Sequence, residues 1–142
     1  MAIGKLVGYA VKAHPSVLNG DHTYVVAEDG SGRAWGCIGR ASDPNGREIC
    51  NGLGSVDQAQ CLARTDGTAG IRWGITGVCH QAANRILHPA GVFVSAALGY
   101  RRSIALYGAY GRVFPKGPHY SPSGKFQWDE LKACLNNNHN HN

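Results

Sequence analysis

One segment of the chain, residues 73–87, reads WGITGVCHQAANRIL. Pro89 follows it by two residues, and because proline disfavours a helix just before it, we expect a helix from Cys79 through Leu87. Its apolar positions fall on one side of such a helix: Cys79, Ala82, Ala83 and Ile86. The segment therefore predicts a core helix that carries a cysteine on its first turn.

Cys79 is the candidate nucleophile. The first turn of a helix has unpaired N–H groups and the positive end of the helix dipole, and both lower the pKa of a thiol. The same N–H groups could stabilise a developing oxyanion. Gly74 and Gly77 lack a Cβ, which leaves room for a substrate to approach. The alternative is a small buried cysteine that only begins a core helix.

A cysteine nucleophile needs a base, and His22 is the preferred candidate. It opens the run HTYVVA, residues 22–27, which predicts a strand that could face the helix across a sheet. The alternative is a surface histidine beside the turn at residues 19–21. His80 adjoins Cys79, but consecutive helical residues project about 100° apart. We therefore expect His80 and Gln81 to line the site without acting as the direct base.

The rest of the chain predicts short strands joined by glycine-rich turns. Residues 29–32, DGSG, predict a hairpin turn into a strand over 33–38, and Ser55 is expected to cap a helix ending at Arg64. Two runs, 91–98 and 103–107, predict a second hairpin, and 126–135 a terminal helix. The predicted class is α+β, a short antiparallel sheet packed against the cysteine-bearing helix. It forms one domain over 1–135, followed by a disordered Asn/His tail at 136–142.

Composition excludes several classes of protein. The chain has 142 residues, 43% of them hydrophobic, which can bury a core and excludes whole-chain disorder. No apolar run approaches the ~18–20 residues of a membrane helix, and the N-terminus lacks the apolar region of a Sec signal. We expect synthesis in the cytoplasm, no membrane partner, and any export by a signal-peptide-independent route. The five cysteines form no CxxC, so we expect mostly buried, reduced thiols.

The order of His22 on a strand, further strands, and then Cys79 at a helix start resembles a known branch of cysteine enzymes. It is similar to the circularly permuted papain-like superfamily, which includes NlpC-type peptidases and lecithin retinol acyltransferase-like proteins. The resemblance spans roughly residues 20–110. It implies a permuted papain-like fold in which Cys79 is the nucleophile and His22 the base. A third polar residue usually orients the histidine; residues 33–40 offer no Asp, Asn, Gln or His for this role, which leaves Asp29 at the hairpin turn.

The resemblance also implies a reaction. It is acyl transfer by a cysteine peptidase or amidase, with a peptide or amide substrate such as peptidoglycan or protein amides, and with no cofactor or metal. A small basic enzyme of this kind is expected to be a bacterial effector or toxin, with a cognate inhibitor (immunity) protein as partner.

Two alternatives come from other classes. The net charge is +5, and cations interleave with aromatic rings as in a binding module for nucleic acid or a protein partner: Tyr100, Arg101, Arg102, Tyr107, Tyr110 and Arg112. RNP, KH and zinc-finger signatures are lacking, so nucleic acid is not the partner we expect. A metal site formed by Cys79, His80, Cys37 or Cys61 is the third hypothesis, although these residues lack paired ligand spacing.

Overall fold

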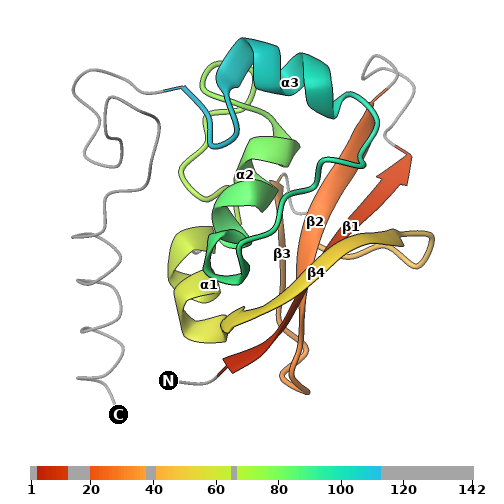
Figure 1. Cartoon of the computed structure of the whole chain (residues 1–142), viewed down its shortest axis with the longest axis vertical. Coiled ribbons are helices and arrows are strands. Elements are labelled where there is room, and N and C mark those ends of the chain that lie inside the picture. Colours follow the sequence, from red (N-terminus) through yellow and green to blue (C-terminus); the bar gives the residue numbers. More distant parts are fainter. Residues whose placement is uncertain (1–2, 13–19, 38–40, 65–66, 113–142) are drawn as a thin grey trace.

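The computed structural model describes residues 3–12, 20–37, 41–64 and 67–112, which form a sheet and a layer of helices (Figure 1). The predicted α+β class is confirmed at this level. The tail at 136–142, the helix over 126–135 and the domain end at 135 lie outside the described residues. The elements are β1 (Ile3–Lys12), β2 (Asp21–Glu28), β3 (Ala34–Gly36), β4 (Arg47–Ser55), α1 (Val56–Ala63), α2 (Cys79–Ile86), the 3-10 helix η2 (His88–Ala90) and α3 (Tyr100–Tyr107).

The four strands form one antiparallel sheet in the order β3-β2-β1-β4. The hairpin predicted around residues 29–32 is confirmed, and it joins β2 to β3. β2 and β1 are the two inner strands, and Leu6 of β1 pairs with Ala27 of β2 and with Gly52 of β4. Directly paired residues of antiparallel strands share one face of the sheet, so this register determines which side chains face the helices.

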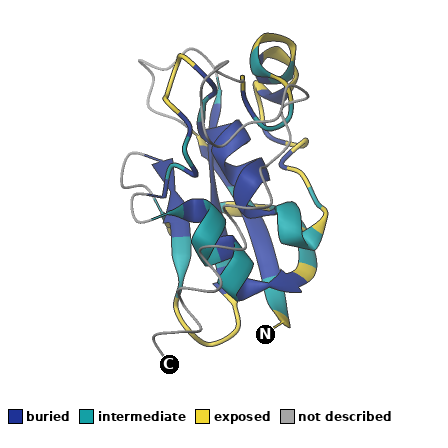
Figure 2. Ribbon diagram, turned by 90° about the vertical axis from the view of Figure 1, so that its left-hand side faces the viewer, coloured by how far each residue is buried: buried dark blue, intermediate teal, exposed yellow. Residues whose placement is uncertain are grey.

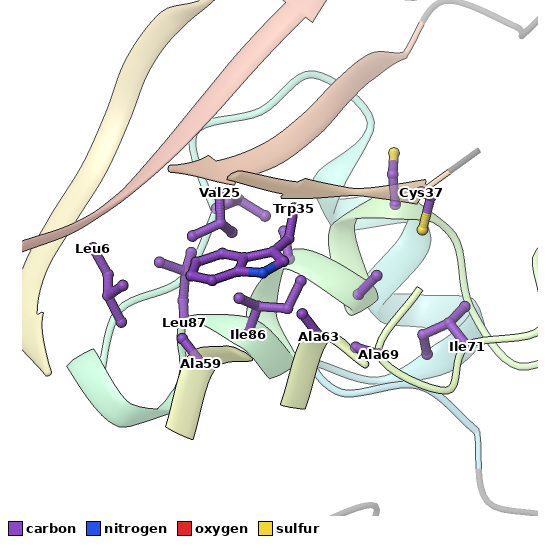
Figure 3. Packing of buried hydrophobic residues seen from close by; sticks show 14 of the residues in the cluster. Leu6, Val25, Trp35, Cys37, Ala59, Ala63, Ala69, Ile71, Ile86 and Leu87 are labelled. Atoms are coloured by element: carbon purple, nitrogen blue, oxygen red, sulfur yellow. The ribbon is translucent and has the colours of Figure 1, made fainter. Parts of the chain in front are cut away.

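Helices α1 and α2 cover one face of the sheet, and the hydrophobic core lies between the two layers (Figures 1 and 3). Trp35 of β3 is 5% exposed, and its ring lies among Val25, Ile86 and Leu87 (Figure 3). Its indole Nε1 donates a hydrogen bond to Gln60 Oε1 of α1 at 3.2 Å. A buried indole N–H needs such a partner, so Trp35 joins the sheet to α1 by a polar contact as well as by packing.

Glycines in β4 let the backbone of η2 lie directly on the sheet. A Cβ at Gly54 would lie 2.7 Å from the carbonyl oxygen of Pro89, and one at Gly52 would lie 2.8 Å from that of Ala90. Real Cβ atoms do not approach backbone this closely, so larger residues would push η2 away from the sheet. Because η2 directly follows α2, these two glycines help to position the cysteine-bearing helix.

Both helices predicted before residue 90 are confirmed. Ser55 caps α1, and its Oγ accepts a hydrogen bond from the backbone N–H of Gln58 at 3.2 Å. Helix α2 begins at Cys79, as the segment 73–87 indicates, and ends one residue before the predicted end. The spans α1 and α2 thus follow from capping and apolar spacing, two signals that lie within the helices themselves.

The second hairpin, predicted from the runs 91–98 and 103–107, is wrong. Residues 91–98 form irregular structure, and Tyr100–Tyr107 is the helix α3. Gly99 adopts φ +86° immediately before the helix, and Gly108 ends it at φ +75°. Both conformations favour glycine, so these residues mark the two ends of a helix rather than turns between strands. Tyr100 and Ser103, three residues apart, are the buried positions of α3.

The expectation of reduced cysteines holds for three of them and fails at one. Cys37, Cys50 and Cys79 carry reduced thiols, whereas Cys61 is disulfide-bonded. Within the described ranges, every helix is too short or too polar to cross a bilayer.

Replacing Gly54 by alanine tests the close approach of η2. We expect Gly54→Ala to destabilise the fold by about 1–3 kcal/mol, because the added Cβ would overlap the Pro89 backbone. Leu53→Ala is the matched control: Leu53 lies on the same strand but is 71% exposed, so its loss should change stability by less than about 0.5 kcal/mol. Urea unfolding of both variants provides the measurement. Equal stabilities would show that η2 does not depend on this contact.

Candidate functional site

Helix α2 is buried along its whole length, including its polar residues Gln81, Asn84 and Arg85 (Figure 2). Buried polar groups are stable only when they are hydrogen-bonded. Gln81 Nε2 donates to Ser103 Oγ at 3.0 Å and to the carbonyl of Gly108 at 3.1 Å. These bonds join α2 to the middle and to the C-terminal end of α3.

Asn84 and Arg85 extend the same pattern to the surrounding loops. Asn84 Nδ2 donates to the Tyr100 hydroxyl at 3.0 Å, and Asn84 Oδ1 accepts from the backbone N–H of Val94 at 3.0 Å. Arg85 Nη1 donates to the carbonyl of Ala69 at 2.9 Å. The helix therefore fixes the irregular segments on both sides of it.

Cys79 lies at the start of α2, against the first residues of β2. Its Sγ donates toward the carbonyl of Asp21 at 3.7 Å and lies 4.0 Å from His80 Nδ1. Val78 precedes the helix as its N-cap, and the backbone N–H of Val78 donates to Gln81 Oε1 at 3.0 Å. The expected position of the cysteine on a first helical turn is thus observed.

His80 is 2% exposed and is fixed by two partners. Its Nδ1 lies 2.9 Å from Thr23 Oγ1, and the ring also bonds the backbone carbonyl of Leu98. The other ring nitrogen, Nε2, lies near Gly99, the residue that follows Leu98 in the chain. Since a carbonyl can only accept, we assign the ring proton to Nε2, which leaves Nδ1 to accept from the Thr23 hydroxyl.

Burial shifts the pKa values of both groups toward their neutral forms. It raises the pKa of the Cys79 thiol, while hydrogen bonds from Thr23 and from the backbone at His80 and Cys79 itself act in the opposite direction. Burial likewise lowers the pKa of His80, against smaller raising contributions from the Leu98 carbonyl and Asp21. At neutral pH the pair is therefore a thiol beside a neutral imidazole, and not a preformed thiolate–imidazolium pair.

The structure does not bring His22 to Cys79. Alternate residues of a strand point to the same face of the sheet. Val25 and Ala27 of β2 belong to the core under α2, so Thr23 also faces the helix. His22 therefore faces the other side of the sheet. There the His22 ring stacks on Tyr24 with centroids 5.9 Å apart. His80, which the sequence places at the margin of the site, is the histidine that lies against the sulfur.

The two other predicted site residues have structural contacts of their own. Asp29 lies past the far end of β2, about 20 Å of extended strand from Thr23, and its carboxylate accepts from Ser31 and Arg33. Gln81 is fully buried, and its bonds go to Val78, Ser103 and Gly108. In the structure, Thr23 is the polar side chain that contacts the histidine, as the third residue was expected to do.

Thr23 was missed by reasoning from the sequence, although one signal for it exists. It lies two and four residues before the core residues Val25 and Ala27, so all three point to the same face of β2. The run from His22 to Ala27 is buried or nearly buried at every position, so the alternation that would separate the two faces is weak.

Comparisons with protein-family models, with curated proteins and with solved structures each found no match. A search of the described ranges for three or more His, Cys, Asp or Glu side chains grouped to hold a metal ion also found none. The chemistry of the site must therefore be argued from its own geometry.

The buried imidazole predicts a pH-dependent stability. Because the folded-state pKa of His80 is lowered, the unfolded chain binds more protons in acid. The free energy of unfolding should be at its full value above about pH 6.5 and should decrease as the pH falls below that value. His80→Gln should reduce this decrease when urea unfolding is measured between about pH 7.5 and 5.5. Burial also lowers the pKa of His88, so His88 should account for a further part of the decrease in stability. The variant His88→Gln tests that contribution.

Proposed function

We propose that the protein is a thiol-dependent acyl-transfer enzyme, a cysteine peptidase or amidase, with Cys79 as nucleophile and His80 as base. One observation carries the proposal: Cys79 Sγ at a helix start lies 4.0 Å from His80 Nδ1, which in turn bonds Thr23 Oγ1 at 2.9 Å. A nucleophile, a base and a residue that orients the base are the parts such a reaction needs.

The first chemical step follows from the protonation states. The Thr23 hydroxyl, which also bonds the sulfur, turns its hydrogen from Nδ1 to Sγ. His80 Nδ1 then takes the proton of the Cys79 thiol as Sγ attacks the substrate carbonyl carbon and forms a tetrahedral intermediate. The backbone N–H groups of Cys79 and His80, which bond the sulfur at the start of α2, stabilise its oxyanion in this proposal. The C–N bond then breaks, the leaving amine receives the proton from His80, and the acyl group remains on sulfur as a thioester.

The second step restores the enzyme. Water or an amine attacks the thioester carbonyl, and His80 accepts a proton from that nucleophile. The C–S bond then breaks, and His80 returns the proton to the sulfur, which restores the thiol and the neutral imidazole. The carbonyl of Leu98 keeps the Nε2–H form of the ring, so that Nδ1 is available as base in both steps.

The proposed relation to the permuted papain-like superfamily rests on the general arrangement. A cysteine at a helix start packs against an antiparallel sheet whose strands precede it in the chain. The base in this proposal is His80 and not the strand residue His22, because His22 faces the other side of the sheet. Peptide or protein amides, peptidoglycan amides included, remain the proposed substrates. A role as a bacterial effector with an inhibitor protein is part of the same proposal.

Acylation by p-nitrophenyl acetate tests the pair directly. We expect an acetyl thioester at Cys79, located by mass spectrometry of proteolytic peptides, with release of p-nitrophenolate. Cys79→Ser should abolish it, while Cys50→Ser, which removes another free thiol, should not. His80→Gln should slow acylation about 100-fold, through loss of the general base, and His22→Gln should change it less than about twofold.

The pH profile separates general-base catalysis from the reactivity of an ordinary thiol. The wild-type rate should fall only below about pH 6.5 and stay level between about pH 7 and 8.5, because His80 is then neutral. In His80→Gln the rate should rise about tenfold per pH unit, since only the thiolate then reacts. Thr23→Val, which keeps side-chain shape, should lower the wild-type plateau. If His22→Gln and not His80→Gln removes the plateau, the assignment of the base is wrong.

One observation favours the alternative of a basic binding module. Arg101 and Arg102 are exposed on α3, and within the described part of the chain neither forms an ion pair. The helix replaces the predicted hairpin, and Tyr100 is buried with its hydroxyl bonded to Asn84, so this ring is not available to stack on a base.

A further inference from the structure

A surface cavity of about 690 Å³ lies where the end of β1, the start of β2 and the start of α3 meet. Four cationic side chains from three parts of the fold line it: Lys12, Arg47, Arg101 and Arg102. The one acid among its lining residues is Asp21, which is 7% exposed. Cations therefore outnumber acids by four to one around this cavity.

Asp21 is already neutralised by its own partners. Its Oδ2 accepts from Arg47 Nη2 at 2.5 Å and from the backbone N–H of Leu98 at 2.8 Å. Lys12, Arg101 and Arg102 form no ion pair with any residue in the described ranges. Three positive charges are thus available to a ligand at the cavity.

Two of these charges occupy an unfavourable position. Arg101 and Arg102 lie in the first turn of α3, which contains no acidic residue, and the helix dipole disfavours cations there. Gly99, the N-cap, has no side chain to accept from the first-turn N–H groups. An anion in the cavity would offset both features, because it attracts the arginines and the helix N-terminus together.

The rest of the cavity lining is largely apolar, so it suits a peptide better than a small inorganic anion. Ala96, Ala97 and Leu98 contribute to it, and the side of Tyr100 completes it. Leu98 is 59% exposed, so it offers apolar surface that a ligand could cover. Apolar surface beside cationic groups suits a peptide with carboxylate side chains. A single-stranded nucleic acid would instead need exposed aromatic rings in the cavity on which its bases could stack.

The cavity shares its wall with the Cys79–His80 pair. Asp21 lines the cavity, and its carbonyl contacts Cys79 Sγ; Leu98 lines it, and its carbonyl bonds the His80 ring. The backbones of these two residues are joined by a hydrogen bond from Asp21 N to Leu98 O at 2.9 Å. One layer of backbone therefore separates the basic cavity from the proposed nucleophile.

We propose that this cavity binds an acidic segment of the peptide substrate, a proposal that rests on the acyl-transfer function and names its substrate class. Carboxylates of the segment pair with Arg101, Arg102 and Lys12. Its backbone lies against the Asp21–Leu98 pair, on whose other side are Cys79 and His80. Selectivity for acidic peptides would thus come from α3 and the end of β1, and the chemistry from α2.

Fluorescence anisotropy with labelled hexaglutamate tests binding without requiring turnover. Wild type and Cys79→Ser should bind it equally, and matched hexaglutamine should not bind. Arg101→Gln/Arg102→Gln should weaken binding about tenfold or more, through loss of two charge-assisted contacts. Lys5→Gln/Arg33→Gln is the control, since it removes the same two charges at residues that pair with Glu28, Asp29 and Asp57 away from the cavity.

The outcomes separate this proposal from the acyl-transfer function. Binding that depends on Arg101 and Arg102 supports the cavity even if Cys79 is not acylated. If the two double variants weaken binding equally, the effect is net charge alone and the proposal is overturned. It is also overturned if labelled oligothymidine binds more tightly than hexaglutamate through the same arginines, because the cavity would then be a nucleic-acid site.

Discussion

The structure depends on the burial of a polar helix. Gln81, Asn84 and Arg85 of α2 are inside the protein, so each must find hydrogen-bond partners there. They find them in the carbonyls, hydroxyls and N–H groups of the segments around α2. This requirement holds α3 and the irregular segment before it against the helix. It thereby places Leu98 where its carbonyl can fix the His80 ring.

Part of the fold could be predicted because its signals are local. The cap at Ser55, the cysteine before an apolar helical face, and the DGSG turn each specify an element without reference to distant residues. Strands β1 and β4 were not predicted, because Gly4, Gly8, Gly52 and Gly54 interrupt their β pattern. Those glycines are there for tertiary reasons: a Cβ at Gly8, for example, would lie 2.5 Å from Cys50 Sγ.

The site was predictable at its nucleophile and not at its base. The position of Cys79 follows from where a helix begins, whereas the partner of its sulfur depends on which face of β2 packs on α2. That strand is covered on both faces: Tyr24 on one side donates its hydroxyl to the Asp43 carbonyl, and Thr23 on the other contacts His80. With both faces buried, polarity alone cannot show that Thr23, not His22, faces inward.

The inner position of β1 constrains the order in which the sheet can form. Of the four strands of this sheet, β1 is the first to be synthesised, yet it pairs with β2 on one side and β4 on the other, and β4 ends at Ser55. The sheet cannot be completed until that residue has left the ribosome, and the cover from α2 comes later still. A nascent chain therefore exposes one edge of β1 until β4 has been synthesised, and during this interval chaperone binding would protect β1 from pairing with other chains.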